Sequence, residues 1–231
     1  MTDISKVLLD GRPVTLRVRR NRRARRIQTR IDTTSGAVIL VLPTYASEAQ
    51  GLEFIYQHEN WLLRRLSELP LHIPFANGAI IPFHGVPHRI RRGFSSKRRV
   101  QLADGAIEFN GKYDGLAPHL TTWLRAEARS TIQPLAMEKA AVIGRTPYAV
   151  SIRDQKSRWG SCSSTGRLSF NWRLIMAPHN ILDYVVAHEA AHLVQMNHSK
   201  QFWCIVGQLT ENVEQARDWL KIHGSGLHRY G

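Results

Sequence analysis

The stretch "VVAHEAAHLVQMNHSKQFW", Val185–Trp203, places three histidines and one glutamate within eleven residues of an otherwise apolar run. His188 and His192 are four residues apart, so on an α-helix their side chains differ by about 40° in direction and share one face. Two imidazoles in this arrangement can grip one metal ion. Glu189 points about 100° away from His188, so it reaches a water molecule beside the ion more readily than the ion itself. That is the position of a general base in an HExxH site.

A third protein ligand has to come from further along the chain, because a catalytic zinc ion normally has three protein ligands plus water. His198 follows His192 by six positions, and on a continuous helix it would point roughly 240° away. The chain must therefore turn before His198, and Asn197, which tolerates the left-handed conformation, marks a place for the helix to end. A later carboxylate, Glu211 or Glu214, is the alternative third ligand.

An incidental origin for these polar residues is disfavoured, because four ionisable groups buried without partners would each cost a few kcal/mol. A cysteine nucleophile is also disfavoured, although Cys162 precedes the histidines, because a metal ion would compete for the same imidazoles. A purely structural zinc clamp remains a further possibility for the three histidines.

Upstream of this helix, "SRWGSCSSTGRLSFNW", residues 157–172, contains two further candidates. We expect a loop rich in turn-forming residues that leads into a strand. Arg158 can bind a substrate carboxylate or phosphate or stabilise an oxyanion, or it can pair with Asp154 and brace the loop. Asn171 can bond either to a substrate backbone or to a neighbouring strand.

Patterning along the chain predicts an α+β fold with a boundary near residue 112. Residues 1–112 are expected to form a β-rich subdomain with a basic hairpin: a three-stranded antiparallel meander over 13–43, then a helix that starts at a capping box of Ser47 and Gln50 and runs to Leu69. Short strands follow up to residue 110. Residues 113–231 are mainly helical, with a kink or new turn expected at Pro134. No internal repeat is apparent.

Composition narrows the class of protein. The 231 residues include 43% hydrophobic residues, typical of a globular chain, and no apolar run reaches the roughly 18 residues of a membrane span. The start of the chain lacks the order of a signal peptide, and two cysteines form no disulfide framework, so we expect a cytoplasmic protein.

A net charge of +14 favours a polyanionic partner. Eight arginines fall between Arg17 and Arg30. They form either a nucleic-acid contact or only a solvated face.

Several motifs together resemble one known family. They are "RRNRRARRI", "IPFHG", "DQKSRWGSCSSTGRLSFNWRLIMAP", "LDYVVAHEAAHLVQMNHSKQFW" and "ARDWLKIHG". The chain resembles the YgjP-like metal-dependent hydrolases, which are related to SprT-like metallopeptidases and to the HExxH zincins. The resemblance implies one zinc ion bound by His188, His192 and His198, with Glu189 as base and proton shuttle. It also implies a β-rich N-terminal part packed on a zincin-like core.

The expected function is that of a zinc metallopeptidase acting through a metal-activated water. Nucleoside triphosphate pyrophosphate hydrolysis at the same site is the alternative substrate class, and the resemblance leaves both open. A third possibility is a nucleic-acid-associated protease that uses Arg17 to Arg30 to hold phosphate backbone.

Overall fold

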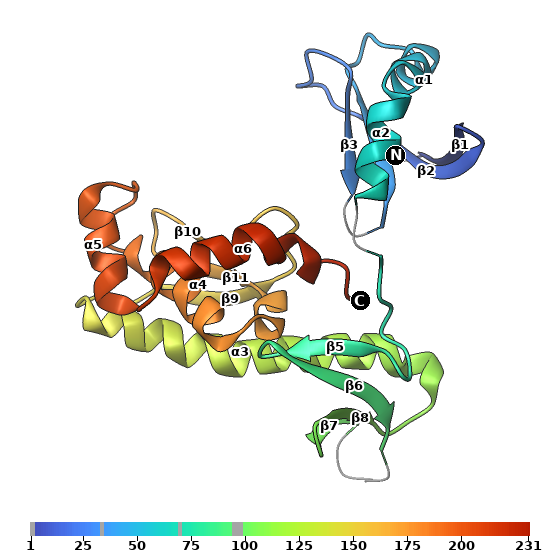
Figure 1. Ribbon diagram of the computed structural model, residues 1–231. Helices are drawn as coiled ribbons and strands as arrows, with labels where there is room; N and C mark the ends of the chain where they lie inside the picture. The colour runs from blue at the N-terminus through green and yellow to red at the C-terminus, as the bar shows by residue number, and fades with distance from the viewer. Residues whose placement is uncertain (1–2, 33–34, 69–70, 94–98) are drawn as a thin grey trace. The chain divides into compact units, whose positions relative to one another are not determined.

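The computed structural model describes residues 3–32, 35–68, 71–93 and 99–231 (Figure 1). The chain divides into two compact units, Met1–His72 and Ile73–Gly231. This division does not coincide with the boundary expected near residue 112. The reason lies in the apolar core: Ile81, Ile90 and Phe109 belong to the same buried cluster as the C-terminal helices.

The first unit contains a mixed sheet in place of the expected antiparallel meander. Its order is β1-β2-β4-β3, with β4 parallel to β2 and antiparallel to β3. The prediction of a meander was wrong because the most apolar strand, "AVILVL", takes the central position, while the polar "QTRID" goes to the edge. The strands are β1 Asp3–Leu9, β2 Arg12–Arg20, β3 Gln28–Asp32 and β4 Ala37–Leu42.

Two helices follow where one was expected. The capping box at Ser47 and Gln50 is confirmed and starts α1, Glu48–Gln57. The helix is interrupted at His58, whose φ of −108° and ψ of 16° are not helical, and α2 spans Glu59–Ser67. Ile55 of α1 and Leu62 of α2 are fully buried in one cluster with the inner face of the sheet.

The second unit begins with a sheet that has the topology of the first. Its order is β5-β6-β8-β7, with β6 and β8 parallel and both outer pairs antiparallel. The strands are β5 Ile80–Phe83, β6 Val86–Arg92, β7 Val100–Ala103 and β8 Ala106–Phe109. The four-stranded arrangement therefore occurs twice among the described residues, although the sequence suggested no repeat.

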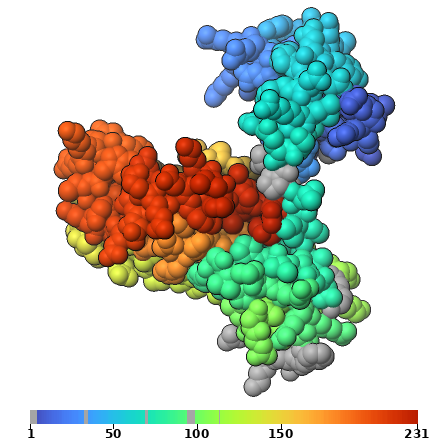
Figure 2. All heavy atoms as spheres, in the orientation of Figure 1, coloured from blue at the N-terminus to red at the C-terminus, as the bar shows by residue number. Residues whose placement is uncertain are grey.

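The remainder of the second unit is built on a long helix, α3, Leu116–Val142, which continues through Pro134. A three-stranded sheet of order β10-β11-β9 accompanies it. The space-filling view shows α5 and α6 on one face of this unit (Figure 2). The elements are η1 Tyr113–Gly115, β9 Ala149–Arg153, β10 Gly160–Cys162, β11 Arg167–Asn171, η2 Trp172–Met176, α4 His179–Ala191, α5 Lys200–Leu209 and α6 Val213–Leu227.

A membrane-crossing helix is not found: within the described ranges, every helix is too short or too polar for a span.

Candidate metal centre

The helix that carries the HExxH motif, α4, ends earlier than expected. Its last residue is Ala191, and His192 is the C-cap. The turn predicted near Asn197 therefore occurs at His192, and Asn197 has no positive φ. The chain then reverses through a short network in which Nε2 of Gln195 donates to Oδ1 of Asn197 at 2.9 Å and to Oγ of Ser199 at 3.2 Å.

Ser199 begins the next helix by accepting the backbone N–H of Phe202. The reversal brings His198 back beside the two histidines of α4. The three ring centroids lie 4.9–5.0 Å from one another. Potential ligand nitrogens of His188, His192 and His198 all lie within 4.8 Å of one another, and no other such group occurs among the described residues.

One pair of nitrogen atoms has a spacing close to that of two ligands on a tetrahedral ion. Nε2 of His188 and Nε2 of His198 are 3.1 Å apart, whereas zinc–nitrogen bonds at tetrahedral angles place ligand nitrogens roughly 3.3–3.4 Å apart. Nδ1 of His192 lies 3.0 Å from the carbonyl oxygen of Gln195. A carbonyl only accepts, so Nδ1 carries the proton and Nε2 keeps its lone pair for a metal. The triad can hold a metal ion.

An apolar floor supports all three rings. Phe202 of α5 is fully buried, and its ring centroid lies 4.9, 4.5 and 4.7 Å from those of His188, His192 and His198. This contact was missed from the sequence, where Phe202 reads only as core. Burial, followed by the charges of the two neighbouring histidines, lowers the pKa of His188 to about 4. His188 is therefore neutral at pH 7, as a ligand must be.

The side chain of Glu189 lies against β10. Its side chain lies against the backbone of Gly160, where a Cβ would come 2.7 Å from Oε1 and 2.8 Å from Cδ of Glu189. The residue is 7% exposed. Burial raises the pKa of Glu189 to about 7, and the positive charge of Arg158 opposes the rise. A carboxyl group poised near neutral pH can both accept and return a proton.

Arg158 lies in the loop that leads into β10, and its side chain is exposed. The alternative pairing with Asp154 is not formed. Asp154 instead binds Arg173 of η2, and its Oδ2 lies 3.2 Å from Nη2 of Arg125 on α3. The loop is therefore braced without Arg158, whose charge is left to act on Glu189.

Asn171 lies at the end of β11 and is fully buried. Its Nδ2 donates to the carbonyl of Gln155, and its Oδ1 accepts the backbone N–H of Arg173 at 3.0 Å. The side chain thus holds the same loop to the start of η2. The side chain thus bonds to backbone within the protein, but to a loop and to η2 and not to the neighbouring strand that was expected as the second role.

Trp159, the last residue of this loop, packs against α6. Its indole packs on Gly224, where a Cβ would lie 3.2 Å from Nε1, and its ring centroid is 5.1 Å from that of His228. Its backbone carbonyl accepts the N–H of Asn171 at 2.8 Å. The loop before Gly160 is fixed at both ends, which sets the position of β10 beside Glu189.

Cys162, the last residue of β10, shows no features of a nucleophile. Burial, with the nearby negative charge of Glu189, raises the pKa of its thiol to about 11. A thiol with such a pKa is protonated at pH 7 and is a poor nucleophile.

The alternative carboxylate ligands do not join the donor group. Glu214 on α6 has a side chain that is 80% exposed and pairs with Arg217 at 2.9 Å. Arg217 in turn stacks 4.9 Å from the ring of Trp203, whose ring lies 5.8 Å from His198. Sequence reasoning missed this arginine beside the site. Asp183, a further carboxylate on α4, binds Lys139 at 2.7 Å.

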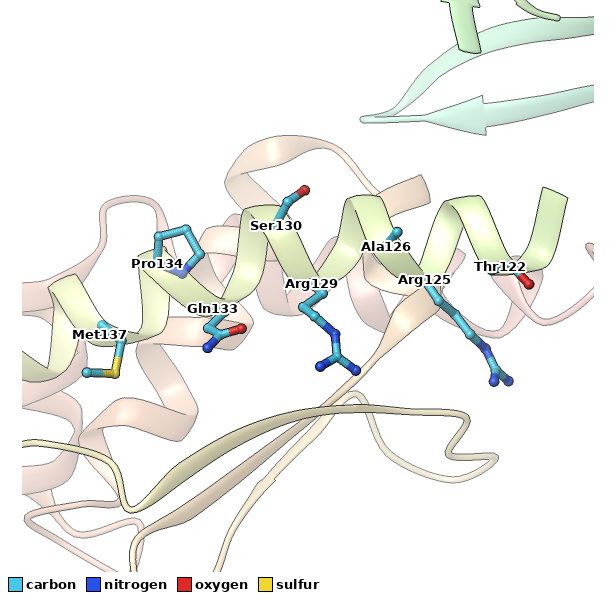
Figure 3. Close-up of a pocket in the computed structure, with 8 residues that line it drawn as sticks. All are labelled: Thr122, Arg125, Ala126, Arg129, Ser130, Gln133, Pro134 and Met137. Atoms are coloured by element: carbon cyan, nitrogen blue, oxygen red, sulfur yellow. The ribbon is translucent and has the colours of Figure 1, made fainter. Parts of the chain in front are cut away.

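A hollow lies along α3 (Figure 3). Its volume is about 780 Å³, and its lining includes Arg125, Arg129 and Met137. None of the triad residues lines it. The hollow is therefore separate from the candidate metal centre.

One family model and two solved structures are similar to this chain. The family model "YgjP-like, metallopeptidase domain" matches residues 25–223. A search of curated proteins finds no match. Among solved structures, the metallopeptidase zymogen abylysin of Pyrococcus abyssi is 22% identical, covers 41% of this chain and 93% of its own, and has a TM-score of 0.36. The zymogen jannalysin of Methanocaldococcus jannaschii is 21% identical, covers 40% and 94%, and has a TM-score of 0.35. From the family match, the chain belongs to the YgjP-like metallopeptidase domain family.

Proposed function

We propose that the protein is a zinc-dependent peptidase in which His188, His192 and His198 hold the ion and Glu189 is the general base. The observation that supports this most is the convergence of three imidazoles beside a buried carboxyl group. Zinc is favoured over harder cations because an all-imidazole donor set suits it. When bound, the ion supplies Lewis acidity that polarises the scissile carbonyl and activates water.

Glu189 has the two properties that proton transfer needs. Its carboxylate sits on the strand side of the triad, where a water molecule between ion and substrate has to lie, and its pKa is raised to about 7. Near neutral pH it takes a proton from the attacking water and returns it to the leaving amine. Gly160 leaves room for this carboxylate against the backbone.

The edge of the three-stranded sheet supplies a place for an extended peptide. Among the described residues β10 pairs only with β11, so its other edge has free backbone N–H and C=O groups. A substrate strand that adds to this edge would pass Glu189, because Gly160 is the first residue of β10. Exposed Arg158, two residues before Gly160, would bind a carboxylate of the peptide or the developing oxyanion.

Two positively charged residues near the triad keep nucleotide hydrolysis as a second candidate. Both are arginines: the positive charge of Arg158 lowers the pKa of Glu189, and that of Arg217 lowers the pKa of His188. Phosphate oxygens are as good partners for guanidinium as carboxylates. The family match favours the peptide.

The experiment compares wild type with Glu189→Gln on two substrates, an unfolded protein and a mixture of nucleoside triphosphates, after zinc content has been measured in both proteins. We expect equal zinc and a loss of peptide hydrolysis of at least 100-fold in the variant. Unchanged turnover at unchanged zinc would leave only a structural clamp. Loss restricted to nucleotides would replace the peptide with the second candidate.

A further inference from the structure

The two four-stranded sheets have the same pairing register, which makes individual positions comparable. In the first sheet Val41 pairs with Arg19 on one side and Gln28 on the other. In the second sheet Glu108 pairs with Arg91 and Gln101 in the same way. Arginine and glutamine thus recur at matching positions, and only the central residue between them differs in charge.

That difference decides what each arginine can bind. Arg91 is satisfied within the protein, since its guanidinium reaches Glu108 at 3.0 Å and Asp104 at 3.3 Å. Arg19 faces Val41 instead, is exposed, and has no ion pair among the described residues. Where the second sheet neutralises its arginine, the first sheet presents it to solvent.

Two neighbouring arginines on this outer face differ in their pairing. Arg30 lies in the next row of this outer face, opposite Ile39, and is exposed without an acidic partner among the described residues. Arg17, also opposite Ile39, has one partner, Asp32 at 3.5 Å. The opposite face of the sheet is buried against α1 and α2. The face that carries these arginines is therefore the one left to solvent.

The connection from β2 to β3 adds a compact loop of four exposed arginines. They are Arg22, Arg23, Arg25 and Arg26. Oδ1 of Asn21 accepts the backbone N–H of Arg23 at 3.0 Å, and the N–H of Asn21 continues the sheet by donating to Leu42 at 2.9 Å. The loop is therefore held at its base by the sheet itself.

An exposed aromatic ring stands beside this loop. The hydroxyl of Tyr45 donates to the carbonyl of Arg25 at 2.9 Å, while its side chain leaves the residue 74% exposed. Nη1 of Arg20 donates at 2.9 Å to the carbonyl of Ala46, the residue that follows Tyr45. The ring is fixed at its polar end and open on its face, which is how a base-stacking platform is presented.

We propose that the outer face of β2 and β3, with the loop 21–27 and Tyr45, binds single-stranded nucleic acid. This surface is referred to below as the arginine face. All of its cations are arginines, which favours bidentate contacts with phosphate. A solvated face would need neither unpaired arginines on a structured loop nor an exposed ring between them. The phosphodiester chain provides the repeated anions, and a base provides the stacking partner.

The test is fluorescence anisotropy of the full chain with labelled 20-nucleotide RNA, DNA and duplex DNA over a range of salt. We expect affinity for single strands to fall steeply with salt. Arg19→Ala with Arg30→Ala is expected to weaken binding at least 10-fold and to reduce the slope of log affinity against log salt by about 1.4, from roughly 0.7 per phosphate contact. Tyr45→Ala is expected to weaken binding at least 5-fold at every salt concentration.

The matched control is Arg64→Ala with Arg65→Ala on α2, which removes the same charge from arginines already paired with Glu68. It is expected to change affinity less than twofold. An equal loss in this control would show a mere effect of net charge and overturn the proposal. The absence of binding to any strand would also overturn the proposal. So would tighter binding to duplex DNA with an unchanged affinity of Tyr45→Ala. Binding only to anionic lipid vesicles, measured by co-sedimentation, would overturn it as well. Comparison of the affinities for single-stranded RNA and single-stranded DNA identifies which of the two is preferred.

Discussion

Gly160 and Glu189 lie in direct contact: a Cβ on Gly160 would come 2.7 Å from Oε1 of Glu189. Gly160 has an ordinary negative-φ backbone, so glycine is needed here for space and not for conformation. The candidate base is held between this backbone and the helix that carries the histidines. Any side chain at residue 160 has to displace it.

Gly160→Ala is therefore expected to lower kcat for peptide hydrolysis at least 10-fold while zinc content stays at the wild-type level. The control is Gly207→Ala on α5, where a Cβ meets nothing within 4 Å. That change is expected to leave kcat intact and to raise the free energy of unfolding by about 0.5–1 kcal/mol. Steady-state kinetics and urea unfolding measure both, and full activity of Gly160→Ala would refute the contact's role.

His198→Ala is expected to reduce zinc affinity by at least 100-fold, because two ligands on one helix hold the ion weakly. Glu214→Ala, which removes only a group paired with Arg217, is expected to leave zinc affinity unchanged. Competition with a chromogenic chelator gives both values. Retention of zinc by His198→Ala together with loss from Glu214→Ala would transfer the third ligand to α6.

Phe202→Leu tests the floor of the triad. The shorter side chain leaves space under three rings, so we expect a loss of about 1–2 kcal/mol in the free energy of unfolding of the metal-free protein. Zinc affinity should fall several-fold as the rings gain freedom. A variant with wild-type zinc affinity and lower stability would show that Phe202 serves the core alone.

Asp154→Asn tests the brace of the loop before β10. Burial alone would raise the pKa of Asp154, but the charge and hydrogen bond of Arg173, with Arg125, hold it below its usual value. A lowered folded pKa means that the stabilisation is complete above pH 3.8 and is lost as pH falls through the folded value. Because Asp154 is 45% exposed, we expect only about 1–2 kcal/mol at pH 7.

The readout is urea unfolding at several pH values between 7 and 2.5. The difference between Asp154→Asn and wild type should shrink as the carboxyl of Asp154 takes up a proton and becomes uncharged, like the amide that replaces it in the variant. A difference that stays constant over this range would mean that the ion pair contributes nothing and that the substitution acts through packing.

The local features of the site were predictable because helix geometry is local. The spacing of His188 and His192 and the offset of Glu189 follow from 3.6 residues per turn. The need for a turn before His198 also followed from this geometry, but its position was wrong. The helix ends at Ala191, and the side chain of Gln195 holds the turn that follows. A glutamine in this role has no strong sequence signature. Ser199, the N-cap of α5, does carry such a signature, because serine is a favoured N-cap residue.

Contacts between distant segments were not predictable in the same way. The insertion of β4 between β2 and β3 depends on which strand is the most apolar, and alternation alone does not order strands. The role of Phe202 under the triad and the reason for Gly160 depend on elements far apart in sequence. The repeated four-stranded arrangement is conserved in topology and register but hardly in residue type, so it appears only in the structure.

The central claim, a zinc ion held by three imidazoles beside Glu189, is tested most directly by zinc K-edge absorption spectroscopy of the protein loaded with one equivalent of zinc. We predict three nitrogen ligands at about 2.0–2.1 Å and no sulfur, with the same spectrum for Glu189→Gln and loss of nitrogen scattering for His198→Ala. A sulfur ligand near 2.3 Å, or a His198→Ala spectrum identical to wild type, would contradict this account.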